Sequence, residues 1–284
     1  MFKKLLVTIS ILSASVMLTS CGFGTVMAYR LTSVLDIDNL GKIINDIGTA
    51  DPNNQMDKLV VGTSESINRQ IKKAKSLREY IEEYETKEEK GTYDPKWVDT
   101  VFFGYYPQSV KAYDTDDMIE WIVLDKDDNK KEATLLSKRV IDVVPYNTES
   151  AFVTWETSSI RRWLNHNFYY FTFGRQDRRR IVNAEVKTNA PEKSMSIGGN
   201  DTVDKVYLLS LEEANEYLKY CELVGKGTIY DDYNGIPMSY WLRNPGNTQN
   251  FACYVHQDGI LSNIGHFVNF ARGIRPVIKV SYAD

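Results

Sequence analysis

The residues best suited to hold a polar ligand lie near the C-terminus, in the stretch Ser239 to Asn247 (SYWLRNPGN). Tyrosine and tryptophan combine an apolar ring with a polar tip, and the arginine fork binds carboxylates and phosphates through two parallel hydrogen bonds. A histidine and a further arginine follow in the next predicted strands and loops. We therefore predict that a ligand contacts six residues: Tyr240, Trp241, Arg243, Asn244, His256 and Arg272.

The same stretch is also typical of a core strand that ends at the Pro245-Gly246 turn. A buried arginine must be hydrogen-bonded or paired, so the pattern favours internal supports over ligand contacts for Arg243 and Arg275. Arg272 falls in a predicted loop and is freer to meet a ligand. The pattern favours the core strand, with Arg243 and Asn244 at its rim as ligand contacts.

Arginines form a second group with binding chemistry. Six of them fall within residues 161–180, and in an acidic protein they could bind phosphate, a carboxylate or a wall polymer. The alternative is that they lie on solvated helix faces and pair with Asp or Glu. The six are Arg161, Arg162, Arg175, Arg178, Arg179 and Arg180.

Motifs for catalysis and metal binding are missing from the sequence. No serine lies in G-x-S-x-G or S-x-x-K, and Cys253 and His256, three apart on a predicted strand, face opposite sides. The histidines lack the spacing of a zinc site, and residues 125–136 lack the glycine and final carboxylate of a calcium loop. We predict no catalytic residue, no metal and no cofactor.

The N-terminus predicts export and lipid anchoring. Lys3 and Lys4 precede an apolar run too short to span a bilayer, and the run ends in Leu18-Thr19-Ser20-Cys21. This ending resembles the bacterial lipoprotein box, which implies a signal peptide over residues 1–20 and lipidation of Cys21. We expect the protein on the outer face of the cytoplasmic membrane, held by its lipid, in a Gram-positive bacterium.

The charge of the chain argues against nucleic-acid binding. The 284 residues carry 34 basic and 38 acidic side chains, a formal net charge of -4. Proteins that bind nucleic acids usually carry a strong basic excess. We expect the partners to be the membrane, through the lipid, and a glycan, wall polymer or surface protein.

The part of the chain before residue 96 reads as a connecting region. Residues 21–62 predict a tether broken by glycines, and residues 63–95 predict a stalk helix that starts at Ser64. Apolar residues recur there at steps of three and four, which gives one apolar stripe. The stripe either rests on the following domain or binds a partner helix. It consists of Ile67, Ile71, Ala74, Leu77, Ile81 and Tyr84.

Residues 96–284 predict one α+β domain. Strand patterns cover 98–107, 118–125, 132–138, 140–147, 204–210, 240–244, 251–257, 259–264 and 273–280, and helix patterns cover 157–171, 175–186 and 211–220. Residues 126–131 predict a hairpin turn, and 189–202 and 221–238 predict long loops. Two cysteines, Cys221 and Cys253, either form a disulfide or remain free thiols.

Short motifs occur in a fixed order between residues 98 and 281: FGYYPQS, EWIVLD, ATLLSK, VVPYN, TWETSSIRRWLN, VDKVYLLSLEEA, YWLRNPG, VHQDG and RGIRPVI. Together they resemble a bacterial domain family of unknown function that is common in surface lipoproteins. The pattern of residues 239–280 is similar to the C-type-lectin-like fold of formylglycine-generating sulfatase modifiers. Oxidising members of that family hold copper with two close cysteines, whereas Cys221 and Cys253 are far apart. The resemblance implies a lectin-like antiparallel core with two or three helices and long binding loops.

The sequence thus predicts a lipid-anchored extracytoplasmic binding protein that recognises a glycan, a cell-wall fragment or a protein through loops of its C-terminal domain. One alternative is an enzyme on the same fold, an oxidase or a cell-wall hydrolase. Another is a structural module that assembles through the stalk helix.

Overall fold

The computed structural model describes residues 66–86, 98–106, 118–217, 225–226 and 236–283. The predicted signal peptide, Cys21, the tether, Ser64 and Cys221 lie outside the described residues. Within these ranges, no helix is both long and apolar enough to cross a membrane.

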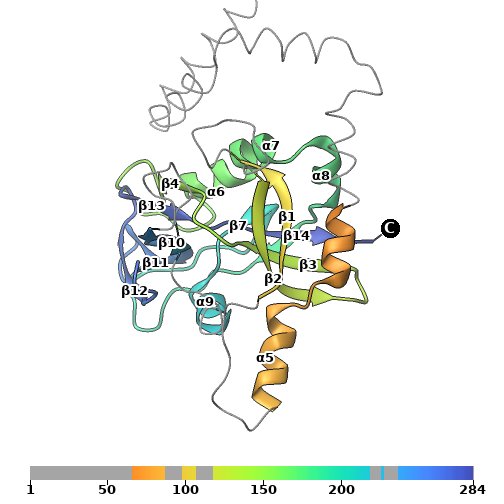
Figure 1. Ribbon diagram of the computed structural model, residues 1–284. Coiled ribbons are helices and arrows are strands. Elements are labelled where there is room, and N and C mark those ends of the chain that lie inside the picture. Colours follow the sequence, from red (N-terminus) through yellow and green to blue (C-terminus); the bar gives the residue numbers. More distant parts are fainter. Residues whose placement is uncertain (1–65, 87–97, 107–117, 218–224, 227–235, 284) are drawn as a thin grey trace, which may run out of the picture.

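Two five-stranded sheets form the framework of the molecule (Figure 1). The first has the order β1-β2-β3-β14-β7 and the second the order β12-β11-β10-β13-β4. The first contains β1 (Thr100–Tyr105), β2 (Met118–Asp127), β3 (Glu132–Ser137), β14 (Val277–Ser281) and β7 (Val206–Tyr207). The second contains β12 (Leu261–Phe267), β11 (Phe251–Val255), β10 (Tyr240–Pro245), β13 (Ala271–Ile274) and β4 (Asp142–Pro145).

Pairing in the described sheets is antiparallel except between β10 and β13. The hairpin of β2 and β3 forms around the predicted turn, because Asp127 and Glu132 face each other where the polar residues begin. Two short pairs complete the strands: β5 (Ala184–Val186) with β6 (Thr202–Asp204), and β8 (Gly225–Lys226) with β9 (Pro237–Met238). The predicted α+β class with mostly antiparallel sheets is confirmed.

The sequence predicted one strand over residues 273–280, and this prediction is wrong. The segment forms two strands that belong to two different sheets. β13 ends at Ile274 and β14 begins at Val277, so the chain changes sheet at Arg275-Pro276. Proline has no N–H for a continuous ladder. Arg275 is buried at this junction and donates to the carbonyls of Ser137 at 3.0 Å and Lys138 at 3.1 Å. It is an internal support, one of the two roles that the sequence left open.

Helices connect the two sheets. The predicted helix over 157–171 is present as α6 (Ser159–Trp163), a π-helical turn (Leu164–Phe168) and α7 (Tyr169–Thr172). The N-cap is Ser158, whose hydroxyl accepts from the backbone N–H of Arg161 at 3.3 Å. Figure 1 shows α6 and α7 at one end of the molecule and α9 (Leu211–Tyr217) at the other.

The helix predicted over 175–186 is too long. It ends as α8 (Arg175–Arg180), and residues 184–186 form β5 instead. Ala184 and Val186 are buried while Glu185 is exposed, so the segment has the two-residue period of a strand. Pairing with β6 therefore outweighs the local helix pattern.

The predicted stalk helix is broken in the described part. Residues 66–73 are helical, residues 74–76 are not, and α5 (Leu77–Thr86) starts a second helix. Ser76 caps the start of α5, because its N–H and hydroxyl both donate to the Glu79 carboxylate, and the Glu79 N–H donates to the Ser76 hydroxyl. Ile67 and Leu77 are fully buried in the domain core.

Candidate functional site

Four of the six predicted ligand contacts lie on β10, and all four are buried. Tyr240 and Trp241 are 1% exposed, Arg243 is 4% exposed and Asn244 is 0% exposed. Trp241 donates its indole N–H to the Val144 carbonyl at 3.0 Å. The stretch is thus the core strand that the sequence favoured. Its four predicted contacts are buried and do not form a surface that a ligand can reach.

Arg243 has a complete set of protein partners. It donates to both carboxylate oxygens of Glu213, at 2.5 and 3.0 Å, and to the carbonyls of Lys187 at 2.9 Å and Leu208 at 2.8 Å. Asn244 beside it accepts from the Leu211 N–H at 2.6 Å. Arg243 therefore ties α9 to β10, and no donor in this set is directed at an open site.

His256 and Arg272 are the two predicted contacts that solvent can reach. His256 follows β11, and its imidazole lies 2.8 Å from the Asp258 carboxylate. Arg272 on β13 lies over the rings of Tyr254 and Trp241, at 3.8 and 5.4 Å from their centroids. The structure thus brings Trp241, Arg272 and His256 together around Tyr254, away from Arg243 and Asn244.

The arginines of residues 161–180 do not form one surface. Arg178 on α8 donates to the Phe173 carbonyl at 2.6 Å, Arg179 to the Gln176 side chain at 3.3 Å, and Arg180 to the Ala283 carbonyl. Arg161 and Arg162 on α6 instead line a hollow. The predicted basic cluster is therefore split, and only its α6 part borders a cavity.

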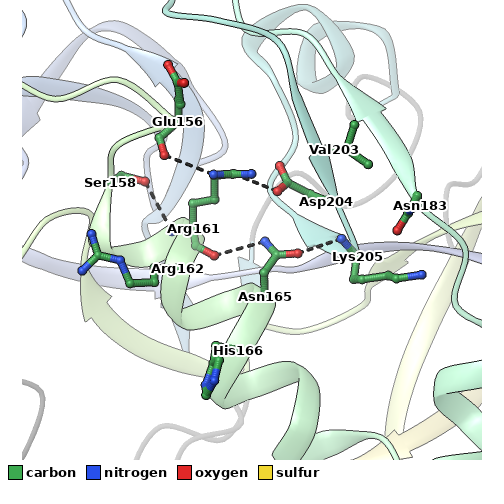
Figure 2. A pocket seen from close by; sticks show the side chains of 10 residues that line it. All are labelled: Glu156, Ser158, Arg161, Arg162, Asn165, His166, Asn183, Val203, Asp204 and Lys205. Atoms are coloured by element: carbon green, nitrogen blue, oxygen red, sulfur yellow. Dashed lines mark hydrogen bonds and ion pairs between the residues drawn. The ribbon is translucent and has the colours of Figure 1, made fainter.

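The hollow beside α6 has a volume of about 410 Å³ (Figure 2). Its lining comes from α6, the π-helical turn, β6 and neighbouring residues including Asn183, and nine of its ten residues have polar side chains. The lining residues are Glu156, Ser158, Arg161, Arg162, Asn165, His166, Asn183, Val203, Asp204 and Lys205.

The floor of this first hollow is a closed hydrogen-bond network around Asp204. Its carboxylate, 1% exposed, accepts from Arg161 Nε at 2.7 Å. Trp155 Nε1 donates to it at 2.9 Å and the Thr202 hydroxyl at 2.7 Å. Three donors offset the cost of burying this charge. The floor is therefore a structural support in which both carboxylate oxygens of Asp204 accept hydrogen bonds.

Asn165 connects the π-helical turn to β7. Its amide donates to the Val206 carbonyl at 2.8 Å and accepts from the Lys205 N–H at 2.7 Å. The extra residue of a π-turn rotates the following side chains, and such turns often occur at functional sites. Here the turn places His166 on the exposed rim of the hollow.

The cationic groups at the rim point in different directions. In Figure 2, Arg162 extends to the far side of α6 from Arg161, and Lys205 extends away from both. Arg162 is exposed and forms no ion pair with another described residue. Lys205 donates to the Ile181 carbonyl at 3.0 Å, and burial lowers its pKa. Arg162 is therefore the cation that this rim offers to a ligand.

A second hollow of about 610 Å³ lies on the other side of Glu156. It exposes an aromatic ring, Phe152 at 80%, together with Ile197 at 68%, whereas the exposed apolar side chain of the first hollow is Val203 at 59%. Its lining residues are Phe152, Val153, Thr154, Glu156, Thr157, Ile197, Gly198, Gly199, Asn200 and Gln249.

The wall of the second hollow is held in place by side-chain contacts to the loop 197–200. Gln249 accepts from the Ile197 N–H at 2.8 Å and donates to the Val153 carbonyl at 2.7 Å. Gly199 has φ +88° and lies so close to Thr154 that an added Cβ would be 2.7 Å from its Cβ. Only glycine fits this conformation and approach without strain.

Glu156 lines both hollows, and we call the two hollows together the α6 groove. Its carboxylate accepts from the Asn200 amide at 3.1 Å in the second hollow. Its backbone carbonyl accepts from Arg161 at 3.1 Å in the first (Figure 2). The groove thus combines a polar half beside α6 with a half that exposes Phe152.

Thiol chemistry has little support in the described chain. Cys253 is a free, buried thiol that donates to the Pro245 carbonyl at 3.0 Å. Burial, with a further contribution from the charge of Glu212, raises its pKa to about 12. The thiol therefore stays protonated at neutral pH. Among the described residues, no group of His, Cys, Asp or Glu side chains is placed to hold a metal ion.

One family model matches the chain. It is described as a domain of unknown function (DUF6273), and it covers residues 130–282, more than half of the 284 residues. The chain belongs to this family. The DUF6273 region starts at residue 130, whereas the predicted resemblance starts at residue 98. No curated protein and no solved structure matches the chain.

The α6 groove lies entirely within the DUF6273 region. Sequence reasoning found part of it, because Arg161 and Arg162 were in the predicted anion cluster. It missed Phe152 and Ile197, which occur in segments without a motif, and it gave no binding role to Glu156, which lies within TWETSSIRRWLN. The pair Gly198-Gly199 in the predicted loop 189–202 was the one local signal of a close backbone approach.

Proposed function

We propose that this chain is a lipid-anchored extracytoplasmic binding protein, and that its C-terminal domain binds a glycan or cell-wall fragment in the α6 groove. The observation that carries the proposal is the second hollow, where Phe152 is 80% exposed beside glycine backbone and amide side chains. An aromatic ring so exposed at a concave surface is a typical sign of recognition.

Sugar rings match this arrangement chemically. One face of a pyranose carries C–H groups that pack on an aromatic ring, and its edge carries hydroxyls that need donors and acceptors. Phe152 supplies the ring, and Thr154, Thr157 and Asn200 supply polar groups around it. Arg162 adds a cation for an acidic substituent. Both hollows fall within the roughly 300–1,000 Å³ that ligand pockets usually have.

The anchoring part of the proposal rests on sequence. The apolar run that ends at Cys21 supports a signal peptide and a lipidated cysteine, which place the domain outside the cytoplasmic membrane. A C-type-lectin-like scaffold is the finer fold that we propose, since the domain has antiparallel sheets, few helices and a binding groove formed partly by a loop.

Thermal melting of the purified protein against a panel of sugars and soluble wall fragments tests the proposal. A fragment present at about 100 times its dissociation constant should stabilise the protein by roughly 2.7 kcal/mol. Phe152→Ala should remove this stabilisation while leaving the melting temperature of the free protein almost unchanged, because the ring is exposed.

Phe102→Ala is the matched control, because Phe102 is also exposed, at 45%, but lies on β1 outside the groove. This variant should keep the full ligand-induced shift. A panel without any stabilising fragment, or a fragment whose effect survives in Phe152→Ala, would contradict the proposed site.

A further inference from the structure

A row of aromatic and basic side chains crosses one face of the second sheet, apart from the α6 groove. It runs from His266 on β12 through Tyr254 on β11 and Trp241 on β10 to Arg272 on β13, four neighbouring strands. Arg272 lies 3.8 Å above the Tyr254 ring centroid, so its guanidinium reaches across β10. We call these four residues the Arg272 row; none of them lines the groove.

Two polar atoms of this row are buried without a partner. Arg272 Nε and His266 Nδ1 are both inaccessible and have no hydrogen bond. In native proteins such atoms are rare, and each calls for an explanation such as a functional role or an unseen water or ion. Arg275, three residues away, shows the contrast, because its guanidinium donates to Ser137, Lys138 and Tyr240.

The charge of Arg272 is also uncompensated within the described part of the chain. No described carboxylate lies within salt-bridge distance of its guanidinium. The guanidinium instead lies over the rings of Tyr254 and Trp241. Burial lowers the pKa of Arg272, and burial together with the Arg272 charge lowers the pKa of His266. His266 is therefore neutral at pH 7 and able to donate or accept one hydrogen bond.

Exposed aromatic rings border the row. Phe270 is 55% exposed and lies 4.9 Å from the His266 ring, and Phe267 is 41% exposed beside it. A ligand that reaches Arg272 can therefore also pack a ring or apolar face on Phe270.

We propose that the Arg272 row is a second binding site, and that it takes the carboxylate of a ligand that also carries a ring or apolar face. The guanidinium fork matches a planar carboxylate through two parallel hydrogen bonds. A single arginine balances one negative charge, whereas a phosphate monoester carries about 1.5 to 2 at pH 7. The ligand chemistry is thus a carboxylate, and its source is an acidic sugar or the C-terminus of a peptide.

Two matched ligand pairs test the site on the intact protein by equilibrium titration. N-acetylmuramic acid and N-acetylglucosamine differ by a lactyl carboxylate, and a short peptide ending in Phe can carry a free or an amidated C-terminus. We expect the carboxylate member of one pair to bind at least tenfold more tightly than its uncharged partner, and that pair identifies the source. Equal binding within both pairs, or no binding by either carboxylate, would overturn the proposal without any variant.

Variants then locate the carboxylate. Arg272→Gln should abolish the preference, and Arg272→Lys should reduce it, because lysine keeps the charge and loses the fork. Arg179→Gln makes the same charge change on exposed α8 and should keep the full preference. Phe152→Ala should leave the ratio within each pair unchanged, so failure of the groove and failure of this site are distinguishable. A preference that survives Arg272→Gln would place the carboxylate elsewhere.

Discussion

At the scale of single residues, burial decides which polar side chains support the fold and which remain available. Arg243 on β10 and Arg272 on β13 lie on neighbouring strands of one sheet, yet Arg243 is fully hydrogen-bonded and Arg272 Nε has no partner. The sequence predicted that Arg272 is the freer of the two, but it could not give the partners of Arg243, which come from residues 187, 208 and 213. Such long-range contacts leave no local signature.

Arg243→Ala should lower the free energy of unfolding by about 3 kcal/mol, because it leaves Glu213 unpaired and two carbonyls without donors. Urea unfolding followed by circular dichroism measures the change. Arg179→Ala is the control and should change stability by less than about 0.5 kcal/mol, since Arg179 is exposed. An equally small effect of Arg243→Ala would contradict its role as an internal support.

Asp177 predicts a specific pH dependence of stability. Burial raises the pKa of its carboxyl to about 6, although the Gly174 N–H, which donates to it at 3.2 Å, acts in the opposite direction. The folded state therefore binds a proton more tightly than the unfolded state, whose Asp pKa is about 3.9. As the pH rises from about 4 to 6, this group lowers stability, and the loss is complete above pH 6.

Asp177→Asn should remove that loss. We expect the variant to be more stable than the parent by about 1–2 kcal/mol at pH 7 and to show no gain at pH 4. Unfolding free energies at a series of pH values measure this difference. Asp201→Asn, an exposed position, should leave the profile unchanged. A gain that is equal at pH 4 and pH 7 would show that titration of Asp177 is not its cause.

At the scale of elements, strands and helices with clear periodicity could be predicted from the sequence. The places where a helix breaks or a strand pairs with a distant segment could not. The hairpin 118–137 and the helix after Ser158 follow local patterns. The break at Ser76, the strand at 184–186 and the change of sheet at Arg275-Pro276 depend on capping or on distant strands. The groove is lined by four separate segments of the chain, which explains why only its α6 arginines were found.

The ion pair of Arg161 and Asp204 joins α6 to β6 and supports the groove floor. Asp204→Asn should therefore cost about 2–3 kcal/mol of stability, because Arg161 loses its charged partner and the amide places a donor among existing donors. It should also weaken the binding of a ligand in the α6 groove, although Phe152 itself is unchanged. Asp201→Asn, three residues away and exposed, serves as the control in both unfolding and ligand titrations. Unchanged stability in Asp204→Asn would contradict this role for the network.

At the scale of the whole molecule, the two sheets and the helices between them carry the two surfaces that we propose as binding sites. The α6 groove exposes Phe152 and Arg162, and the Arg272 row exposes a guanidinium on an aromatic bed. A domain held at the membrane by a lipid could use both surfaces on one extended wall polymer. Binding of the polymer at one surface then raises its effective concentration at the other surface, so two weak contacts give a higher overall affinity.

The most direct test of the account is to map a bound wall fragment on the protein by amide chemical shifts. A soluble fragment that stabilises the protein would be titrated into the ¹⁵N-labelled chain. The account predicts that the largest shifts fall on residues 152–157 and 197–200, which line the second hollow. Shifts confined to other faces, or no shifts at saturating fragment, would contradict a glycan-binding role for the α6 groove.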